Sequence, residues 1–182
     1  MKIRDSGMPD EAYWESLFDV PLILSRLGVD QFHDVAELGC GYGTFSVPIA
    51  KAISGTLHTF DVDPAMLDRT RVRGAGLRIV CEQRDVMESG FGVEVDAALL
   101  SNILHCERPV DLLRRAADAA ETVLMIHWRY GETPRGPGFD IRPRPEQIVA
   151  WAAEAGLLAG ERIDLPPWHY GFILSGGGSG NR

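Results

Sequence analysis

The sequence predicts an α/β protein built on a single doubly wound, mostly parallel sheet with helices on both faces. Strand-like and helix-like segments alternate from about residue 34 to residue 128. The expected strands are almost continuously apolar, as at 95–104 (VDAALLSNIL), and such strands are typical of a parallel sheet covered on both faces. With 182 residues, the chain is long enough for one domain and short for two. We therefore expect one domain over 1–175 and a flexible tail at 176–182.

Each element is expected from its local pattern. The amphipathic stretch at 9–27 predicts one or two N-terminal helices, with Pro21 marking a break. The expected strands of the alternating region are 34–38, 55–63, 77–86 (with its turn), 95–104 and 122–128, and the expected helices are 45–53, 64–74 and 108–120. A loop rich in Pro, Gly and Arg follows at 129–145 on the substrate side, and loops of that length are often functional. The chain then ends with a helix at 145–158 and a strand pair at 161–165 and 168–175.

The composition excludes several classes of protein. A formal net charge of −8 argues against a general nucleic-acid binder, whose affinity depends on neutralising phosphates. No apolar run approaches the roughly 18 residues of a membrane span, and the polar, acidic N-terminus does not resemble a secretory signal. We therefore expect a cytoplasmic protein that binds neither nucleic acid nor membrane. The oligomeric state cannot be inferred from these features.

The cysteines and histidines do not form a metal-binding pattern. Cys40, Cys81 and Cys106 are odd in number, and their spacings match neither a disulfide framework nor a metal site. No two of the five histidines stand at helical ligand spacing. The sequence therefore predicts no metal ion and no disulfide.

Three alternating glycines, Gly39, Gly41 and Gly43, lie directly after the first expected strand. Glycine frees the backbone to turn sharply and to approach a ligand closely, and in a doubly wound sheet this turn meets the cofactor. A dinucleotide fingerprint, Gly-x-Gly-x-x-Gly/Ala, would place a small residue where Thr44 stands. The nearby carboxylate of Glu37 suits a cationic ligand group better than a pyrophosphate.

A second acidic group ends the second expected strand, where Asp61 lies 22 residues after Gly39. A carboxylate at that strand end can accept hydrogen bonds from both hydroxyls of a ribose. The two acidic positions together predict a ligand that has a ribose, lacks a pyrophosphate and carries a cation.

At these residues the chain resembles the class I S-adenosylmethionine-dependent methyltransferases. The resemblance spans about 33–128 and rests on four motifs in the family's order: VAELGCGYGTFS, TFDVDPAML, CEQRDV and VDAALLSNILH. It implies a seven-stranded sheet whose last strand is antiparallel. It also implies methyl transfer from S-adenosylmethionine by in-line displacement at the sulfonium methyl, with S-adenosylhomocysteine as the product.

The resemblance further implies which residues hold the two ends of the methionine moiety. Ser101 and Asn102, which leave the fourth strand, would lie near the sulfonium. The methionine amino and carboxylate groups would contact the residues of the glycine turn and the acid before it, which are Glu37, Gly39, Cys40, Gly41 and Gly43.

The ribose and adenine would be held by residues after the second and third strands. Asp61 would take the ribose hydroxyls, and Val62 and Met66 would lie against the adenine. Asp85 would accept from the adenine amino group, with Val86 beside it. Asp63 belongs either to this cofactor shell or to the N-cap of the following helix.

Three histidines are candidate proton acceptors for the reaction. A thiolate or free amine acceptor needs little more than alignment, whereas a hydroxyl or protonated amine needs a base within reach. The candidates are His127, His105 and His169, and the sequence does not rank them.

Two groups of side chains are candidate substrate contacts. Trp128 and Tyr130 leave the fifth strand at the edge where a substrate would approach. In the long loop, Arg135 and Arg144 would receive an anionic substrate, unless the loop is simply solvated and stiffened by its prolines.

Tyr13 and Trp14, on the N-terminal helix, are a further pair with two possible roles. They either close over the cofactor or fasten their helix to the sheet, and the sequence does not separate these roles.

The acceptor is predicted by elimination to be a small molecule. The Asn/Asp-Pro-Pro-aromatic segment of many enzymes that methylate nucleic-acid amino groups is absent, since SNIL stands at that position. The metal-binding acids of catechol-type enzymes are not recognisable. Two rival functions stay open: a module that binds the cofactor or a partner without turnover, and a nicotinamide-dependent oxidoreductase.

Overall fold

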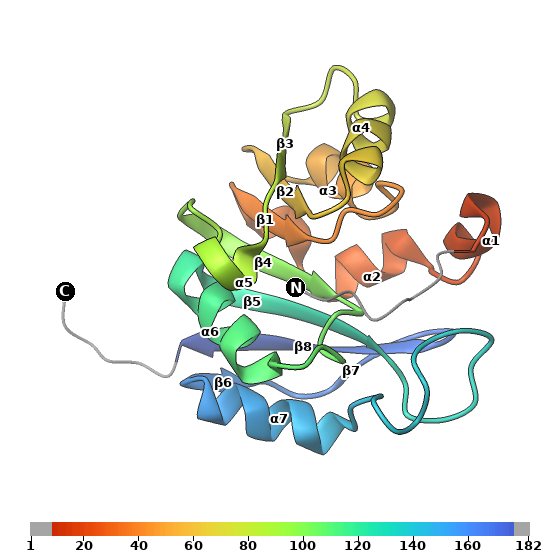
Figure 1. Ribbon diagram of the computed structural model, residues 1–182, viewed down its shortest axis with the longest axis vertical. Helices are drawn as coiled ribbons and strands as arrows, with labels where there is room; N and C mark the ends of the chain where they lie inside the picture. The colour runs from red at the N-terminus through yellow and green to blue at the C-terminus, as the bar shows by residue number, and fades with distance from the viewer. Residues whose placement is uncertain (1–8, 177–182) are drawn as a thin grey trace.

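The computed structural model describes residues 9–176, which form one mixed sheet flanked by helices (Figure 1). Residues 177–182 of the predicted tail lie outside this range. The strands follow the order β3-β2-β1-β4-β5-β8-β6, and β7 pairs with β8 beside this path. Their bounds are β1 (Val35–Leu38), β2 (Leu57–Asp61), β3 (Ile79–Gln83), β4 (Val95–Ser101), β5 (Ala120–Trp128), β6 (Leu157–Ala159), β7 (Ile163–Leu165) and β8 (His169–Gly176).

The pairing of the strands confirms the predicted fold class. β1 to β5 are joined by parallel pairings, whereas β8 runs antiparallel to β5, β6 and β7. The sheet has eight strands rather than the implied seven, because β6 forms where the sequence predicts the end of a helix. Gly156, with a φ of 82°, ends that helix, and a strand of three residues is too short for its hydrophobic pattern to reveal it.

Helices cover both faces of the sheet (Figure 1). One face carries α1 (Glu11–Glu15), α2 (Val20–Arg26), α3 (Ser46–Ala52) and α4 (Pro64–Arg73), and the other carries α5 (Val86–Ser89), α6 (Pro109–Ala119) and α7 (Pro145–Glu154). The N-terminal stretch forms two helices separated at 16–19, so the predicted break lies just before Pro21. Pro21 itself stands in the first turn of α2, where the amide that proline lacks would have no partner within the helix.

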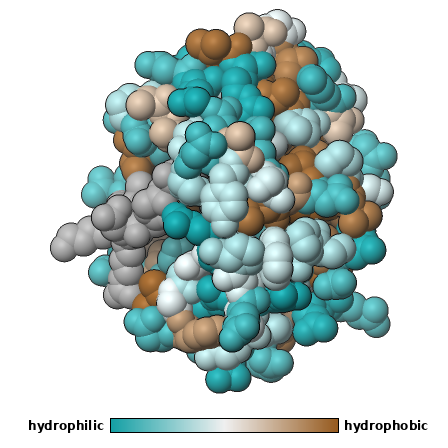
Figure 2. Space-filling view, turned by 90° about the vertical axis from the view of Figure 1, so that its right-hand side faces the viewer, coloured by the Kyte–Doolittle hydropathy of each residue, from teal (hydrophilic) through white to brown (hydrophobic). Residues whose placement is uncertain are grey.

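β4 shows how the sequence produces the two-sided core. Ala97 and Leu99 face the layer of α2 and α3, whereas Ala98 and Leu100 face the layer of α5 to α7. All four are fully buried, and burial of each leucine stabilises the fold by roughly 1.5–3 kcal/mol. Because β1 to β5 are parallel, their carboxyl ends meet at one edge of the sheet. Figure 2 views this side of the molecule, which is mostly hydrophilic with patches of hydrophobic residues.

The N-terminal helix is attached beside the glycine turn. Arg73 of α4 forms ion pairs with Glu11 (2.9 Å) and Glu15 (2.7 Å) of α1. The hydroxyl of Tyr42, within the turn, donates a hydrogen bond to the carbonyl of Pro9 (2.8 Å). The start of the described chain therefore lies against the segment where the sequence predicts the cofactor.

Candidate active site

The glycine turn joins β1 to α3 at the carboxyl edge of the sheet. Gly39, Gly41 and Gly43 have φ values of 80°, 51° and 77°, the left-handed region that side chains disfavour. The amide of Gly39 donates to the carbonyl of Phe60 near the end of β2 (2.7 Å). A Cβ added to Gly43 would stand 3.1 Å from Oγ1 of Thr70 in α4. The turn thus requires glycine both for its conformation and for its close contact with α4.

Asp61 ends β2 and faces this turn. Its Oδ2 accepts from the amide of Gly41 (3.3 Å) and lies 3.7 Å from the thiol of Cys40, and its Oδ1 accepts from the amide of Asp63 (3.0 Å). Burial raises the pKa of the Cys40 thiol, which is therefore neutral. A carboxylate can accept about four hydrogen bonds, so Asp61 retains capacity for a hydroxyl of a ligand.

Glu37 lies beneath the turn rather than in the open. It is 2% exposed, and its Oε2 accepts from the hydroxyls of Ser46 (2.5 Å) and Thr59 (3.0 Å). Burial raises the pKa of Glu37 to about 7, against the opposing effect of these two hydrogen bonds. Its carboxyl group therefore supports the turn from within the core, and a direct contact with the cofactor stays a prediction.

The chain leaves β4 through Ser101, which is half-buried, and Asn102, whose backbone is left-handed with a φ of 53°. Both Nδ2 and Oδ1 of Asn102 are buried and have no hydrogen-bond partner among residues 9–176. Each buried polar atom left unpaired costs about 1–3 kcal/mol, so this amide fits a polar group of a ligand. The next side chain, Ile103, would lie 3.8 Å from a Cβ added to Gly39, which brings this strand end next to the glycine turn.

The predicted ribose and adenine contacts also lie at this edge. Asp63 and Asp85 cap α4 and α5, each accepting at 2.9 Å from the amide of the helix's second residue. Asp63 thus has the helix-capping role that the sequence allowed. Val86 is buried in the core, whereas Val62 and Met66 are half-buried. Their contacts with a cofactor stay predictions.

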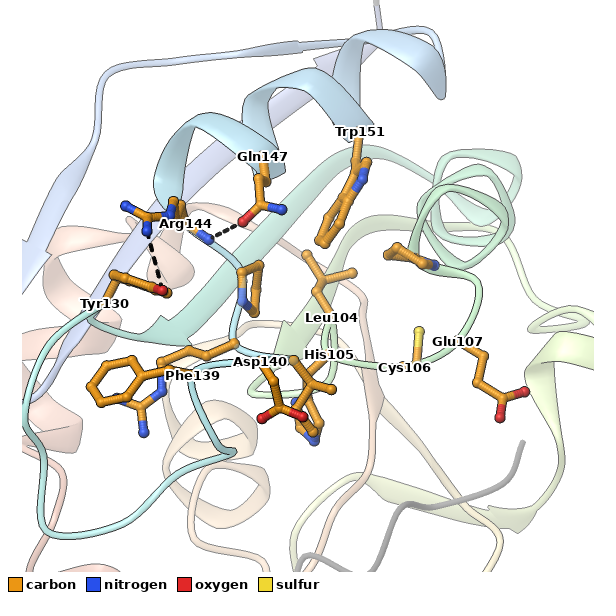
Figure 3. Close-up of a pocket in the computed structure, with 14 residues that line it drawn as sticks. Leu104, His105, Cys106, Glu107, Tyr130, Phe139, Asp140, Arg144, Gln147 and Trp151 are labelled. Atoms are coloured by element: carbon orange, nitrogen blue, oxygen red, sulfur yellow. Dashed lines mark hydrogen bonds between the residues drawn. The ribbon is translucent and has the colours of Figure 1, made fainter.

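A pocket of about 530 Å³ opens at the carboxyl ends of β4 and β5 (Figure 3), within the range of roughly 300–1,000 Å³ typical of small-molecule sites. Its walls come from the segment after β4, from the long loop after β5 and from α7. Leu104, His105 and Glu107 line it from the first segment, and Trp151 points into it from α7. Because His105 follows Asn102 by three residues, the pocket adjoins the end of the predicted cofactor site.

The three candidate histidines occupy different environments. His105 lines the pocket, whereas His127 and His169 are 0% and 2% exposed and do not line it. The rings of His105 and His127 meet edge to face at 5.7 Å. Burial lowers the pKa of both His127 and His169 to about 3. Repulsion from the nearby His105 also lowers the pKa of His127. Among the three, the geometry thus favours His105 as a group that reaches a substrate.

The predicted aromatic substrate contacts also separate into two groups. Tyr130 lines the pocket. Trp128 is buried in the opposite layer, 4.2 Å from the ring of His169 and 6.4 Å from that of Trp14, so Trp14 fastens α1 to the sheet. Tyr13 is 44% exposed on the same helix.

The arginines of the long loop differ in the same way. Arg144 lines the pocket, while Arg135 lies elsewhere in the loop and does not line it. Arg142 also lines the pocket but is buried, and its guanidinium donates five hydrogen bonds to groups of the loop. Arg142 therefore organises the loop that forms this wall.

Residues 35–125, half of the chain, match the family model described as a methyltransferase domain. The chain belongs to the methyltransferase domain family. The sequence-based prediction of a class I S-adenosylmethionine-dependent methyltransferase is thereby confirmed, as is the prediction of an enzyme. No curated protein sequence matches the chain.

Solved structures of other methyltransferases share the fold of this methyltransferase. A SAM-dependent methyltransferase from Aquifex aeolicus is 20% identical, with a TM-score of 0.77 over 91% of this chain and 93% of that one. The S-adenosylmethionine-dependent methyltransferase SibL is 25% identical, with a TM-score of 0.71 over 91% of this chain and 56% of that one. NcsB1, an O-methyltransferase from neocarzinostatin biosynthesis solved with S-adenosylhomocysteine and 1,4-dihydroxy-2-naphthoic acid, is 19% identical, with a TM-score of 0.73 over 85% of this chain and 52% of that one.

Sequence reasoning missed several residues that line the pocket of this methyltransferase. Glu107 follows the fourth motif, and its place after β4 was a signal that could have identified it. Phe139, Asp140 and Trp151 gave no such signal, because their position depends on how the long loop and α7 fold back over β4. Within residues 9–176, no cluster of three His, Cys, Asp or Glu could hold a metal ion, and no helix is long and apolar enough to cross a membrane.

Proposed function

We propose that this methyltransferase transfers the methyl group of S-adenosylmethionine to a small-molecule acceptor bound in the pocket at the carboxyl ends of β4 and β5. The observation that carries the proposal is the position of this pocket, which begins at Leu104 and His105, directly after Asn102, whose buried amide has no partner within residues 9–176. A cofactor site and a small-molecule pocket thus follow one another along a single strand end.

The residues present fit the cofactor. The left-handed glycine turn allows close approach to the backbone, and Asp61 retains acceptor capacity for ribose hydroxyls. Asn102 offers a donor and an acceptor that have no partner in the described part of the chain. Bound S-adenosylmethionine would supply a methyl group already activated by its sulfonium. The protein would then mainly align the acceptor and exclude water.

His105 is the best-placed candidate for the general base. A hydroxyl or protonated amine acceptor must lose a proton, and the base has to lie within hydrogen-bond reach of it. His105 lines the pocket, whereas His127 and His169 lie in the core. His105 would accept the acceptor's proton in the reaction, and its ring contact with His127 would hold its orientation.

The small molecules named for two structural neighbours support a small-molecule substrate. NcsB1 was solved with a dihydroxynaphthoic acid, and RosA is an N,N-8-amino-8-demethyl-D-riboflavin dimethyltransferase. Both named molecules carry aromatic rings, and this pocket has aromatic side chains in its walls. The predictions of a cytoplasmic address and of no nucleic-acid partner are consistent with this proposal and stay predictions.

The test is the fate of a labelled methyl group. The protein is incubated with methyl-labelled S-adenosylmethionine and a cell extract separated into small molecules, protein and nucleic acid. We expect label in the small-molecule fraction, and a raised KM for the acceptor in Trp151→Ala but not in Val149→Ala, an exposed position on the same helix. Label in protein or nucleic acid, or binding of cofactor without transfer to any fraction, would contradict the proposal.

A further inference from the structure

The charged side chains that line the pocket differ in how they are already bonded. The pocket is lined by two arginines and two carboxylates, whose formal charges cancel: Arg142, Arg144, Asp140 and Glu107. A ligand, however, is recognised by groups whose bonding capacity the protein itself has not used. The partners of each side chain therefore decide which charge the pocket offers.

Arg142 offers almost nothing to a ligand. Its Nε and Nη2 donate to the carbonyl of Pro137 (3.0 and 2.8 Å), and its Nη1 donates to the carbonyls of Arg129 (3.1 Å) and Gly131 (2.8 Å) and to Oγ1 of Thr133 (2.9 Å). All three guanidinium nitrogens are thus bonded, and the residue is buried.

Arg144 is also bonded, although it is exposed. Its guanidinium lies 4.1 Å from the centre of the Tyr130 ring, and its Nη2 donates to the hydroxyl of the same tyrosine (3.2 Å) (Figure 3). A guanidinium stacked on an aromatic ring keeps other donors available, but the ring contact fixes it against one wall.

The two carboxylates have no such partners. Neither Asp140 nor Glu107 has a hydrogen bond or an ion pair with another side chain among residues 9–176. In the view of Figure 3, Asp140 lies beside His105, and Glu107 lies beyond Cys106 on the side away from Arg144 and Tyr130. The two carboxylates therefore keep all of their hydrogen-bonding capacity for a ligand, whereas Arg142 has almost none left and Arg144 is held against the ring of Tyr130.

The remaining walls favour a ring beside that charge. Trp151 points into the pocket from α7, and Leu104 lies below it (Figure 3). Phe139 lines the pocket from the loop and is 51% exposed, with the guanidinium of Arg142 5.0 Å from the centre of its ring. Aromatic faces attract cations as well as apolar groups.

We infer that the acceptor carries a cationic group, such as a protonated amine, next to an aromatic or apolar ring, with the cation bound by Asp140 and Glu107. This inference rests on the proposed function, because it takes the pocket as the acceptor site. It also departs from the expectation that the arginines of the loop receive an anionic substrate.

Three phenols of similar size that differ in charge test the inference: tyramine (cationic), para-cresol (neutral) and para-hydroxyphenylacetate (anionic). Their binding to the protein saturated with S-adenosylhomocysteine is measured by ligand-observed NMR, on wild type and on Asp140→Asn/Glu107→Gln. We expect tyramine to bind at least about fivefold more tightly than para-cresol and para-hydroxyphenylacetate to bind more weakly still. The double variant should lose this order, whereas Asp118→Asn, an exposed acid outside the pocket, should keep it.

Each other outcome overturns the inference. Tighter binding of para-hydroxyphenylacetate that is lost in Arg144→Gln would assign the pocket to anions. Equal binding of all three probes, or binding of none, would show that the carboxylates do not select the ligand. The charge series on wild type decides the matter even if a variant does not fold. Failure of S-adenosylhomocysteine itself to bind would instead count against the proposed function.

Discussion

The Nη1 of Arg142 donates a hydrogen bond of 2.8 Å to the carbonyl of Gly131, which closes the loop after β5 onto itself. Because the same guanidinium also bonds Pro137 and Arg129, one buried side chain holds both ends of the loop. The shape of the pocket wall therefore depends on a residue that has little capacity left for a ligand.

We predict that Arg142→Met loosens this loop without affecting the cofactor site. Loss of the guanidinium leaves several carbonyls without their donor, and each buried one costs about 1–3 kcal/mol. Hydrogen exchange should quicken across 129–143, and the KM for the acceptor should rise, with the affinity for S-adenosylhomocysteine unchanged. Arg129→Met is the matched control with the smaller expected effect, because its exposed guanidinium donates one hydrogen bond within the same loop, to the carbonyl of Glu132 (3.3 Å). Unchanged exchange in Arg142→Met would contradict the role assigned to this residue.

Glu37 should make the folded protein less stable as the pH rises. Its pKa is raised from 4.5 to about 7 in the folded state, so the folded state holds a proton that the unfolded state has lost between these values. Glu37 therefore contributes its whole stabilisation of the folded state below pH 4.5. This contribution to the free energy of unfolding is lost as the pH rises through about 7, by up to about 3 kcal/mol.

The measurement for Glu37 is urea denaturation at several pH values on wild type and on Glu37→Gln. The glutamine can keep accepting from Ser46 and Thr59 without titrating, so the decline with pH should flatten in this variant. Glu94→Gln, at an exposed position, should follow the wild type. An equally steep decline in Glu37→Gln would assign the pH dependence to other groups.

His105→Gln should slow methyl transfer to a hydroxyl acceptor by about 10²–10⁴-fold while leaving the affinity for S-adenosylhomocysteine intact. The accompanying readout is the KM for the acceptor, which should change far less than kcat, because a general base acts in the reaction step. His58→Gln, in β2 and away from the pocket, should leave both unchanged. If kcat in His105→Gln equals that of the wild type, His105 is not the general base.

The sheet and the glycine turn could be predicted from the sequence because both depend on local patterns. The apolar run of β4 requires burial on two faces, and the glycines at 39, 41 and 43 require left-handed backbone. The pocket could not be predicted in this way, since Asp140 and Trp151 meet only after the loop and α7 fold over the end of β4. The sequence placed Trp128 at the edge where a substrate would approach, but its side chain is buried in a core layer, because burial depends on the helices that cover the strand.

The central claim is that the carboxyl edge of β1, β2 and β4 binds S-adenosylmethionine, and titration calorimetry tests it most directly. S-adenosylmethionine, S-adenosylhomocysteine and NAD are titrated into wild type, Asp61→Ala and the exposed control Asp118→Ala. We predict that the two sulfur ligands bind wild type and the control, that Asp61→Ala weakens both by about 10–100-fold, and that NAD does not bind. Binding of NAD alone, or equal binding of the sulfur ligands by Asp61→Ala, would contradict the assignment of this edge.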